Sequence, residues 1–194
     1  MQITLGTGNE HKVQEINEIV KSIGANDIVF VPAPIGFSPV ESGETFEENS
    51  LIKSREAAKL SGMISMADDS GLCIESLNGA PGLFSARYGG SQEEKITRVL
   101  KELEGVENRR AKFVCTMSLV DGGGNILHIT KGECHGQIIK ERRGTNGFGY
   151  DPIFLPDGYD ITLAQMSDEG KNAISHRGRA LIKMVNFIKS LVNN

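Results

Sequence analysis

The sequence has no tryptophan, six prolines and three cysteines, and only 6% of its residues are aromatic. Because three is an odd number and no Cys-x-x-Cys pair occurs, the cysteines argue against a disulfide framework and a structural zinc site. No apolar run approaches the roughly 20 residues that cross a bilayer. The start, MQITLGTGNE, lacks the basic and apolar segments of a signal peptide. We therefore expect a cytoplasmic protein without a membrane partner.

The chain also has fewer basic than acidic residues. It contains 21 Lys and Arg and 25 Asp and Glu, which gives a formal net charge of −4. A nucleic-acid-binding protein usually carries a basic excess, so we expect no nucleic-acid partner. A small anionic substrate is compatible with this charge, because a pocket needs only a few local cations. With 194 residues, 39% of them hydrophobic, the chain is long enough for one domain over residues 1–194.

Hydrophobic spacing and turn residues predict an alternation of strands and helices. We expect strands at 2–6, 28–31, 63–67, 72–77, 112–120 and 125–139. We expect helices at 10–23, 45–60 and 91–103, and from about 171 or 175 to 191. Capping boxes begin the second and third helices, and a loop of three glycines at 122–124 predicts a hairpin. Together the βα units and the hairpin indicate an α/β fold with a mixed sheet.

The first chemical candidate is the segment TGNEHK at residues 7–12, between a predicted strand and a predicted helix. Glycine lets the backbone approach an anion, the N–H groups of a helix start point toward it, and Lys12 adds charge. The segment is not a Walker A loop, because Val13 stands where Ser or Thr would bind magnesium. An ordinary strand-to-helix turn explains these residues equally well.

The second candidate is Asp68-Asp69-Ser70-Gly71, which we expect to end a strand. Adjacent aspartates on an extended segment point to opposite faces, so one of them is expected to face a given pocket. Such a carboxylate can hold Mg²⁺ or accept a proton from water. Asp-Asp-Ser-Gly is also good turn chemistry, and that alternative stays open.

Two later segments offer aromatic and polar groups for a planar ligand. In the glycine-rich loop 144–152, an aromatic ring could stack on a base while a carboxylate or backbone group contacts its edge. Residues 171–179 enter the last predicted helix with Ser, His and Arg side chains that could contact a base or a phosphate. A structural loop and an ordinary helix cap are the alternatives.

The order and wording of these segments resemble the non-canonical purine nucleoside triphosphate pyrophosphatase family, also called the inosine triphosphate pyrophosphatase or Ham1-like family. The matching pieces are TGNEHK (7–12), SGETFEEN (42–49), ADDSGL (67–72), GAPGLFSARYGG (79–90), GFGYDPIF (147–154) and SHRGRAL (175–181). The resemblance implies hydrolysis of ITP, dITP and XTP to the monophosphate and pyrophosphate. It also implies Mg²⁺, a homodimer, and an elongated mixed β-sheet flanked by helices, with two lobes and a central nucleotide-binding cleft.

The resemblance also implies roles for individual residues. Asp69 is the catalytic carboxylate and a metal ligand, with Asp68 as its competitor and Glu41 as a second metal ligand. Phe148 stacks on the purine. The phosphate end of the substrate is bound by Thr7, Gly8, Asn9, Glu10, His11, Lys12, Lys53, Ser70 and Arg87. The base and sugar end is bound by Gly149, Tyr150, Asp151, Lys171, Ser175, His176 and Arg177.

Two other functions remain open at this point. One is a house-cleaning pyrophosphatase that acts on other modified nucleotides through a similar site. The other is a nucleotide-sensing or RNA-binding module that does no hydrolysis, against which the Asp68-Asp69 pair and Lys12 argue.

Overall fold

The computed structural model describes residues 1–8 and 10–192, apart from the side chains of Glu10, His11 and Val192. The chain divides into two compact units, each with its own buried core. The first unit comprises Met1–Asp69, Cys115–Gly132 and Arg177–Asn194, and the second comprises Ser70–Val114 and Glu133–His176. A single domain over the whole chain stays a prediction.

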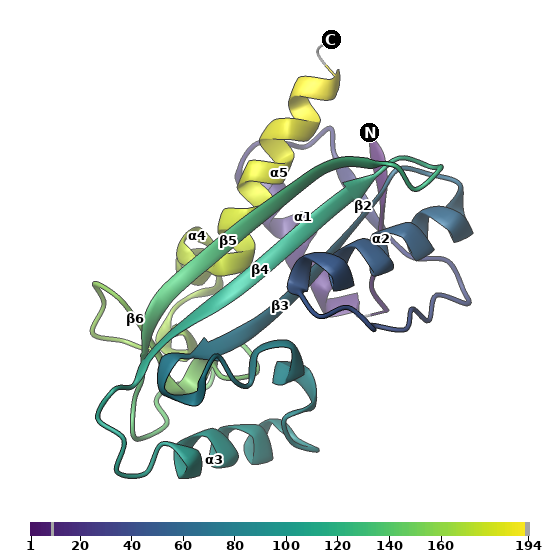
Figure 1. Cartoon of the computed structure of the whole chain (residues 1–194). Helices are drawn as coiled ribbons and strands as arrows, with labels where there is room; N and C mark the ends of the chain where they lie inside the picture. The colour runs from purple at the N-terminus through teal and green to yellow at the C-terminus, as the bar shows by residue number, and fades with distance from the viewer. Residues whose placement is uncertain (9, 193–194) are drawn as a thin grey trace. The chain divides into compact units, whose positions relative to one another are not determined.

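The described residues form one mixed sheet of six strands in the order β2-β1-β3-β4-β5-β6, flanked by helices (Figure 1). The strands are β1 (Gln2–Leu5), β2 (Val29–Pro32), β3 (Ser65–Ile74), β4 (Arg110–Val120), β5 (Ile126–Ile138) and β6 (Phe154–Pro156). The α-helices are α1 (Glu10–Ser22), α2 (Phe46–Ser61), α3 (Gln92–Glu102), α4 (Asp168–Ile174) and α5 (His176–Val192). The α/β class predicted from the sequence is confirmed.

In the first unit, β1 runs parallel to both β2 and β3, with Ile3 opposite Phe30 and Leu5 opposite Met66. The apolar residues of α1 and α5 pack on one face of these strands and form the buried core. Helix α2 lies on the other face, in front of the sheet in Figure 1, while α1 and α5 lie behind it. Because side chains alternate along a strand, neighbouring residues of β3 meet different helices.

Local signals begin and end the helices where the sequence predicts. Thr45 caps α2 by accepting a hydrogen bond from the Glu48 N–H at 3.1 Å, and Ser91 caps α3 in the same way through Glu94. Helix α2 ends at Gly62, whose φ of 66° lies in the left-handed region that glycine adopts without strain. The turn at Asp121 closes the predicted β4–β5 hairpin, since its N–H donates to the Asn125 carbonyl at 3.0 Å.

In the second unit, β5 and β6 pair antiparallel with Gln137 opposite Leu155. Phe113 and Phe154 both belong to the core of this unit, with ring centroids 4.7 Å apart. Strand β6 was not expected, because its three residues carry no periodic signal of their own.

Two expectations about element boundaries are wrong. The segment Asp68-Asp69-Ser70-Gly71 is no turn, because β3 runs through it without a break, and residues 75–77 form a 3₁₀ turn instead of a strand. Buried Leu72 and Ile74 extend the strand beyond the aspartates, and cations from two faces stabilise the two carboxylates within it. Near the C-terminus, an extended Ser175 (ψ 154°) divides the last helical stretch into α4 and α5.

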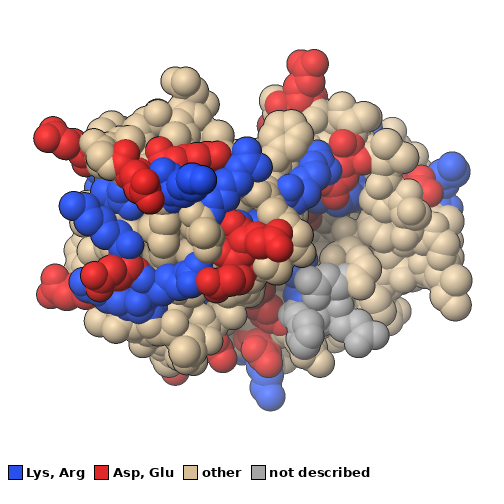
Figure 2. All heavy atoms as spheres, turned by 90° about the horizontal axis from the view of Figure 1, so that it is seen from below, with Lys and Arg blue, Asp and Glu red and all other residues tan. Residues whose placement is uncertain are grey.

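The charged side chains of both signs are mixed on the surface. Figure 2 shows Lys and Arg side chains interspersed with Asp and Glu over the face that it draws. Among the described residues no disulfide joins any of the three cysteines, and Cys115 and Cys134 are buried. Among the described residues, no helix combines the length and the apolar character that a bilayer crossing requires.

Candidate active site

A cavity of about 320 Å³ opens in the first unit, where the end of β1 leads into α1. Gly6 is required at this point, because a Cβ here would lie 2.9 Å from the backbone oxygen of Lys53. The predicted strand, loop and helix are confirmed, because β1 ends at Leu5 and α1 begins at Glu10. The cavity is lined by Gly6, Thr7, Gly8, Lys12, Phe37, Ser38, Pro39, Glu41, Lys53 and Asp68. Asn9 and the side chains of Glu10 and His11 lie outside the described residues.

Asp68 faces α1 and α5 and is neutralised by cations from both helices. Lys12 Nζ lies 3.0 and 3.1 Å from its two carboxylate oxygens, and Arg177 Nη2 lies 3.4 Å from Oδ2. Arg177 is in turn paired with Glu15, at 3.1 Å. Burial alone would raise the pKa of Asp68, but Lys12, Arg177 and Lys53 outweigh it and hold that pKa well below its usual range. Asp68 is therefore a buried carboxylate whose charge is matched within the protein.

Asp69 faces α2 and has a different environment. Its Oδ1 accepts a hydrogen bond from Lys53 Nζ at 2.7 Å, and the same ammonium lies 3.3 Å from Glu41 Oε1. One ammonium thus faces two carboxylates, which leaves this side of β3 with an excess negative charge. Burial raises the pKa of Asp69 above its usual range, because it outweighs the opposing effect of Lys53. A carboxylate with a raised pKa is the better proton acceptor of the two.

Lys53 remains a cation in this arrangement. Burial alone would lower the pKa of Lys53, but the charges of Asp68, Asp69 and Glu41 outweigh it, and the pKa is raised. Lys53 is only 7% exposed and lines the cavity. A buried, permanently charged ammonium at a cavity wall can bind an anionic group that enters from solvent.

The donor set fits a divalent cation that is shared with a substrate. Among the described residues, no group of three Asp, Glu, His or Cys side chains is placed to hold a metal by itself. Glu41 and Asp69 nevertheless bring two carboxylates to one point, with net negative charge between them. Mg²⁺ typically binds one or two protein carboxylates and completes its coordination with substrate phosphates and water. The two residues predicted as metal ligands therefore lie together, as such a site requires.

The second unit contains a separate cluster around Phe148. Asp151 Oδ2 accepts hydrogen bonds from Lys171 Nζ at 2.7 Å and from the Phe148 N–H at 2.9 Å, and both charged residues are buried. The Lys171 ammonium lies 4.5 Å from the centroid of the Phe148 ring, which is 50% exposed. Gly147, with φ of 74°, has no room for a Cβ beside the Asp151 carboxylate. The cluster therefore fixes an aromatic ring that keeps half of its surface open to solvent.

The sequence is similar to proteins of known families. A sequence model of the Ham1 family matches residues 3–187. The chain belongs to the Ham1 family. It is 41% identical over 197 residues to a dITP/XTP pyrophosphatase of Leifsonia xyli, covering 98% of this chain and 97% of that protein. It is 42% identical over 198 residues to a dITP/XTP pyrophosphatase of Treponema denticola, covering 97% and 99%.

Solved structures agree with this placement. A HAM1 protein from Coxiella burnetii matches with a TM-score of 0.86 at 39% identity, over 98% of this chain and 99% of that chain. The Staphylococcus aureus Ham1 protein matches with a TM-score of 0.87 at 37% identity and the same coverage. The mixed sheet with flanking helices is therefore the fold of Ham1 proteins.

The three residues of the Ser175-His176-Arg177 motif in this Ham1 chain have different surroundings. Ser175 follows α4, and the His176 ring stacks on Phe113 in the second unit with centroids 4.8 Å apart. Arg177 belongs to the first unit and binds Asp68 and Glu15. Successive residues of a helix point about 100° apart, which sends these side chains in different directions. A contact of Arg177 with the base or sugar of the substrate stays a prediction.

Three further residues predicted as substrate ligands make contacts inside the second unit of this Ham1 protein. Tyr150 is buried in the core, where its hydroxyl donates to the Ser85 carbonyl at 2.9 Å, and burial raises its pKa. The Gly149 N–H donates to Gln92 Oε1 at 3.1 Å. Arg87 is exposed, with its guanidinium 5.1 Å from the centroid of the Phe84 ring. Ser70 follows Asp69 in β3 and is half-buried. Substrate contacts by these residues stay predictions.

Sequence reasoning missed four residues of the first-unit site. Glu15 supports Arg177, and its signal is its spacing, since it follows Lys12 by three residues and shares its face of α1. Phe37, Ser38 and Pro39 form one wall of the cavity. Their segment has no hydrophobic periodicity, so no local signal assigns it to the site.

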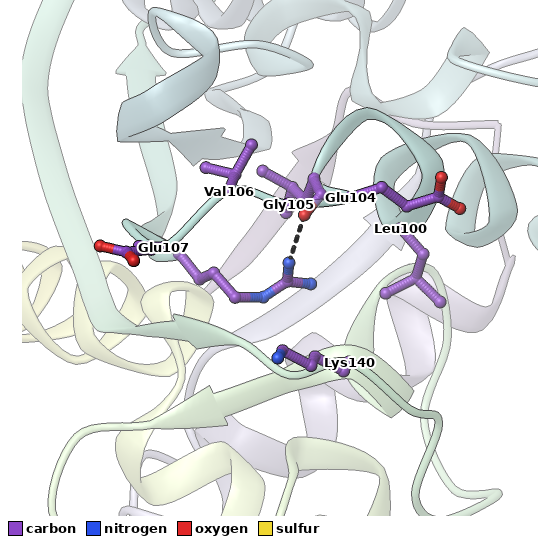
Figure 3. Close-up of a pocket in the computed structure, with 8 residues that line it drawn as sticks. Leu100, Glu104, Gly105, Val106, Glu107 and Lys140 are labelled. Carbon is purple, nitrogen blue, oxygen red and sulfur yellow. Dashed lines mark hydrogen bonds between the residues drawn. The ribbon is translucent and has the colours of Figure 1, made fainter.

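A larger cavity of about 580 Å³ in the second unit is a weaker candidate. Figure 3 shows Leu100, Val106 and Lys140 around it. Arg109, which also lines this cavity, donates hydrogen bonds to the carbonyls of Leu103, Ile138 and Ile139 at 2.7 to 3.2 Å. These bonds connect the end of α3 with the end of β5. The arginine is therefore committed to the fold.

Proposed function

We propose that this chain hydrolyses the non-canonical purine nucleoside triphosphates dITP, XTP and ITP to the monophosphate and pyrophosphate. Its relatives from Leifsonia xyli and Treponema denticola bear the name dITP/XTP pyrophosphatase and match it over nearly their full length. The observation that carries the proposal is the first-unit cavity, which Lys12 and Lys53 line and where Lys53 is paired with the Asp69 carboxylate. Such a reaction removes deaminated purines from the nucleotide pool.

The triphosphate binds in this cavity. Backbone N–H groups at the start of α1 and the ammonium groups of Lys12 and Lys53 supply positive charge to the phosphate oxygens. These donors are fixed before the substrate arrives, since Asp68 holds Lys12 and Asp69 holds Lys53. Preorganised positive charge lowers the barrier by stabilising the charge that moves onto the leaving pyrophosphate.

Asp69 orients or deprotonates the water that attacks the α-phosphorus. Its Oδ1 is held by Lys53, which leaves Oδ2 to accept the water proton. The raised pKa of Asp69 favours this role over Asp68, whose pKa is lowered. Asp69 and Glu41 would hold Mg²⁺, which when bound neutralises phosphate charge and favours departure of pyrophosphate.

The base is bound by the second unit. The half-exposed ring of Phe148 stacks on the purine, and the Lys171–Asp151 pair keeps that ring in place. Donors aimed at the 6-oxo group of hypoxanthine or xanthine would be left unpaired by the 6-amino group of adenine. Each such mismatch costs about 1–3 kcal/mol, or roughly 5- to 150-fold in selectivity.

The test is pyrophosphate release from ITP, XTP, dITP, GTP, ATP and CTP, with Mg²⁺ and with EDTA. The proposal expects rapid release from ITP, XTP and dITP that requires Mg²⁺, and far slower release from ATP and GTP. Release of orthophosphate instead would move the attack to the γ-phosphorus and contradict the proposed site. Slow release from all six nucleotides, with rapid release from a modified pyrimidine nucleotide added to the panel, would support a different house-cleaning pyrophosphatase. Binding without any release would support a nucleotide sensor.

The proposal includes a homodimer in the cytoplasm, with neither nucleic acid nor membrane as a partner. These points follow from the family resemblance and the composition of the chain. Light scattering of the purified protein measures its mass in solution, and a monomer at all concentrations would contradict the dimer.

A further inference from the structure

The segment that carries Glu41 joins β2 to α2 and has neither helix nor strand of its own (Figure 1). The side chain of Glu41 is 36% exposed, yet its carboxylate lies 3.3 Å from the ammonium of Lys53. Irregular surface segments are the more mobile parts of a fold. A carboxylate on such a segment keeps one position only if the segment is bonded to a fixed element.

Two hydrogen bonds provide that attachment, both to the beginning of α2. The Gly43 N–H donates to Asn49 Oδ1 at 2.9 Å, and the Glu44 N–H donates to Glu48 Oε2 at 2.6 Å. Glu48 is exposed, so water competes for the second bond. Asn49 is only 3% exposed, so the first bond is shielded from solvent. The bond to Asn49 is therefore the stronger restraint on the segment.

The geometry around Gly43 shows how closely the segment approaches the helix. A Cβ on Gly43 would lie 2.6 Å from Glu48 Cβ and 2.8 Å from Asn49 Oδ1. Asn49 and Lys53 are four residues apart in α2 and share one face of it. The residue that binds the segment thus lies one helical turn before the residue that meets Glu41.

We propose that Asn49 is a positioning residue for the metal site. By accepting the Gly43 N–H, its side chain holds Glu41 beside Lys53 and Asp69. This inference rests on the proposed function, since it requires Glu41 and Asp69 to bind a divalent cation together. Residues that orient metal ligands in this way commonly change metal affinity by about 10- to 100-fold when they are replaced.

The test compares Asn49→Ala with Ser50→Ala as a matched control. Ser50 is the next residue of α2 and is also fully buried, but its hydroxyl donates to the Glu47 carbonyl within the same helix. Its replacement removes a buried hydrogen bond without touching the Glu41 segment. Two quantities are measured by NMR on the full chain without nucleotide. They are the amide hydrogen exchange of Gly43 and the Kd for Mn²⁺, from paramagnetic broadening of amide signals.

We expect Asn49→Ala to accelerate exchange at Gly43 and to weaken Mn²⁺ binding about tenfold. Ser50→Ala should change neither quantity. In a Glu41→Ala background, Asn49→Ala should no longer affect Mn²⁺ binding, because the residue that it positions is gone. Gly43→Ala displaces the same hydrogen bond from the other side and should reproduce the effect if Asn49→Ala does not fold.

Unchanged Mn²⁺ affinity in Asn49→Ala and Gly43→Ala would overturn the positioning role and leave Asn49 as a stabilising residue only. The same holds if Asn49→Ala weakens Mn²⁺ binding equally in the Glu41→Ala background. Failure of the proposed function looks different. In that case the NMR results follow the expectation, but the unaltered protein releases no pyrophosphate from dITP.

Discussion

Asp68 and Asp69 in the first unit lie in one network with three cations and two further carboxylates, whereas Asp151 in the second unit is paired with the ammonium of Lys171. In the first unit the two neighbouring carboxylates have pKa values shifted in opposite directions, because they face different helices. In the second unit the pair is buried against an aromatic ring. The first arrangement can exchange a proton or bind a cation, while the second keeps the Phe148 ring in one position.

The sharpest test of this comparison is Asp69→Asn. Removing a proton acceptor that also binds the metal should lower kcat by about 10²–10⁴-fold. Nucleotide affinity, measured by calorimetry, should stay within about tenfold, because Lys12 and Lys53 still bind the phosphates. Hydrolysis of dITP near the unaltered rate would show that the catalytic carboxylate lies elsewhere.

Asp68→Asn should mainly lower the free energy of unfolding. The replacement removes one carboxylate partner of the buried Arg177 and the charge that holds Lys12. Breaking a buried ion pair from one side typically costs about 3–5 kcal/mol, measurable by urea unfolding in EDTA at pH 7. Asp69→Asn should cost less than this, since the ionised form of Asp69 is disfavoured by burial. An equal loss in both variants would contradict the comparison.

The same pair gives a pH dependence with a defined sign. The folded protein lowers the pKa of Asp68, so this group stabilises the fold fully above about pH 3.9, the usual value for Asp. Its contribution is lost as the pH falls below that value toward the lower folded pKa. Asp68→Asn should therefore lose less stability than the unaltered protein between neutral and strongly acidic pH. Unfolding curves in EDTA at several pH values measure the difference.

In the second unit, Phe148→Ala should raise KM for dITP about tenfold, since stacking of a base on an aromatic ring contributes about 1–3 kcal/mol. Phe84→Ala is a matched control, because Phe84 is also half-exposed and also has a cation over its ring. It should leave KM unchanged. Equal effects of the two variants would refute base stacking on Phe148.

The smallest effect is expected from Tyr150→Phe. The variant removes the hydroxyl that donates to the Ser85 carbonyl but keeps the ring in the core. It should cost about 1 kcal/mol of unfolding free energy, the usual contribution of one such hydrogen bond. KM for dITP should not change. A large rise in KM would instead support the substrate contact predicted from the family motif.

Much of the candidate site could be predicted from the sequence. The phosphate loop and the opposite directions of Asp68 and Asp69 follow from local rules, and Lys53, Glu41 and Phe148 follow from the family motifs. The motifs were less informative about partners. They grouped Arg177 with His176, although a helix directs the two side chains to different units. They gave no sign that Asn49 attaches the Glu41 segment to α2.

The sequence by itself determined the features that depend on neighbouring residues. The caps at Thr45 and Ser91 and the hairpin turn at Asp121 use hydrogen bonds that span two to four residues. Only the tertiary structure decided that β3 continues through two aspartates, because cations from α1, α2 and α5 stabilise those carboxylates. Lys12 and Arg177 lie 56 and 109 residues from Asp68 along the chain. No local sequence pattern encodes these two ion pairs, since they form only once the helices have packed on the sheet.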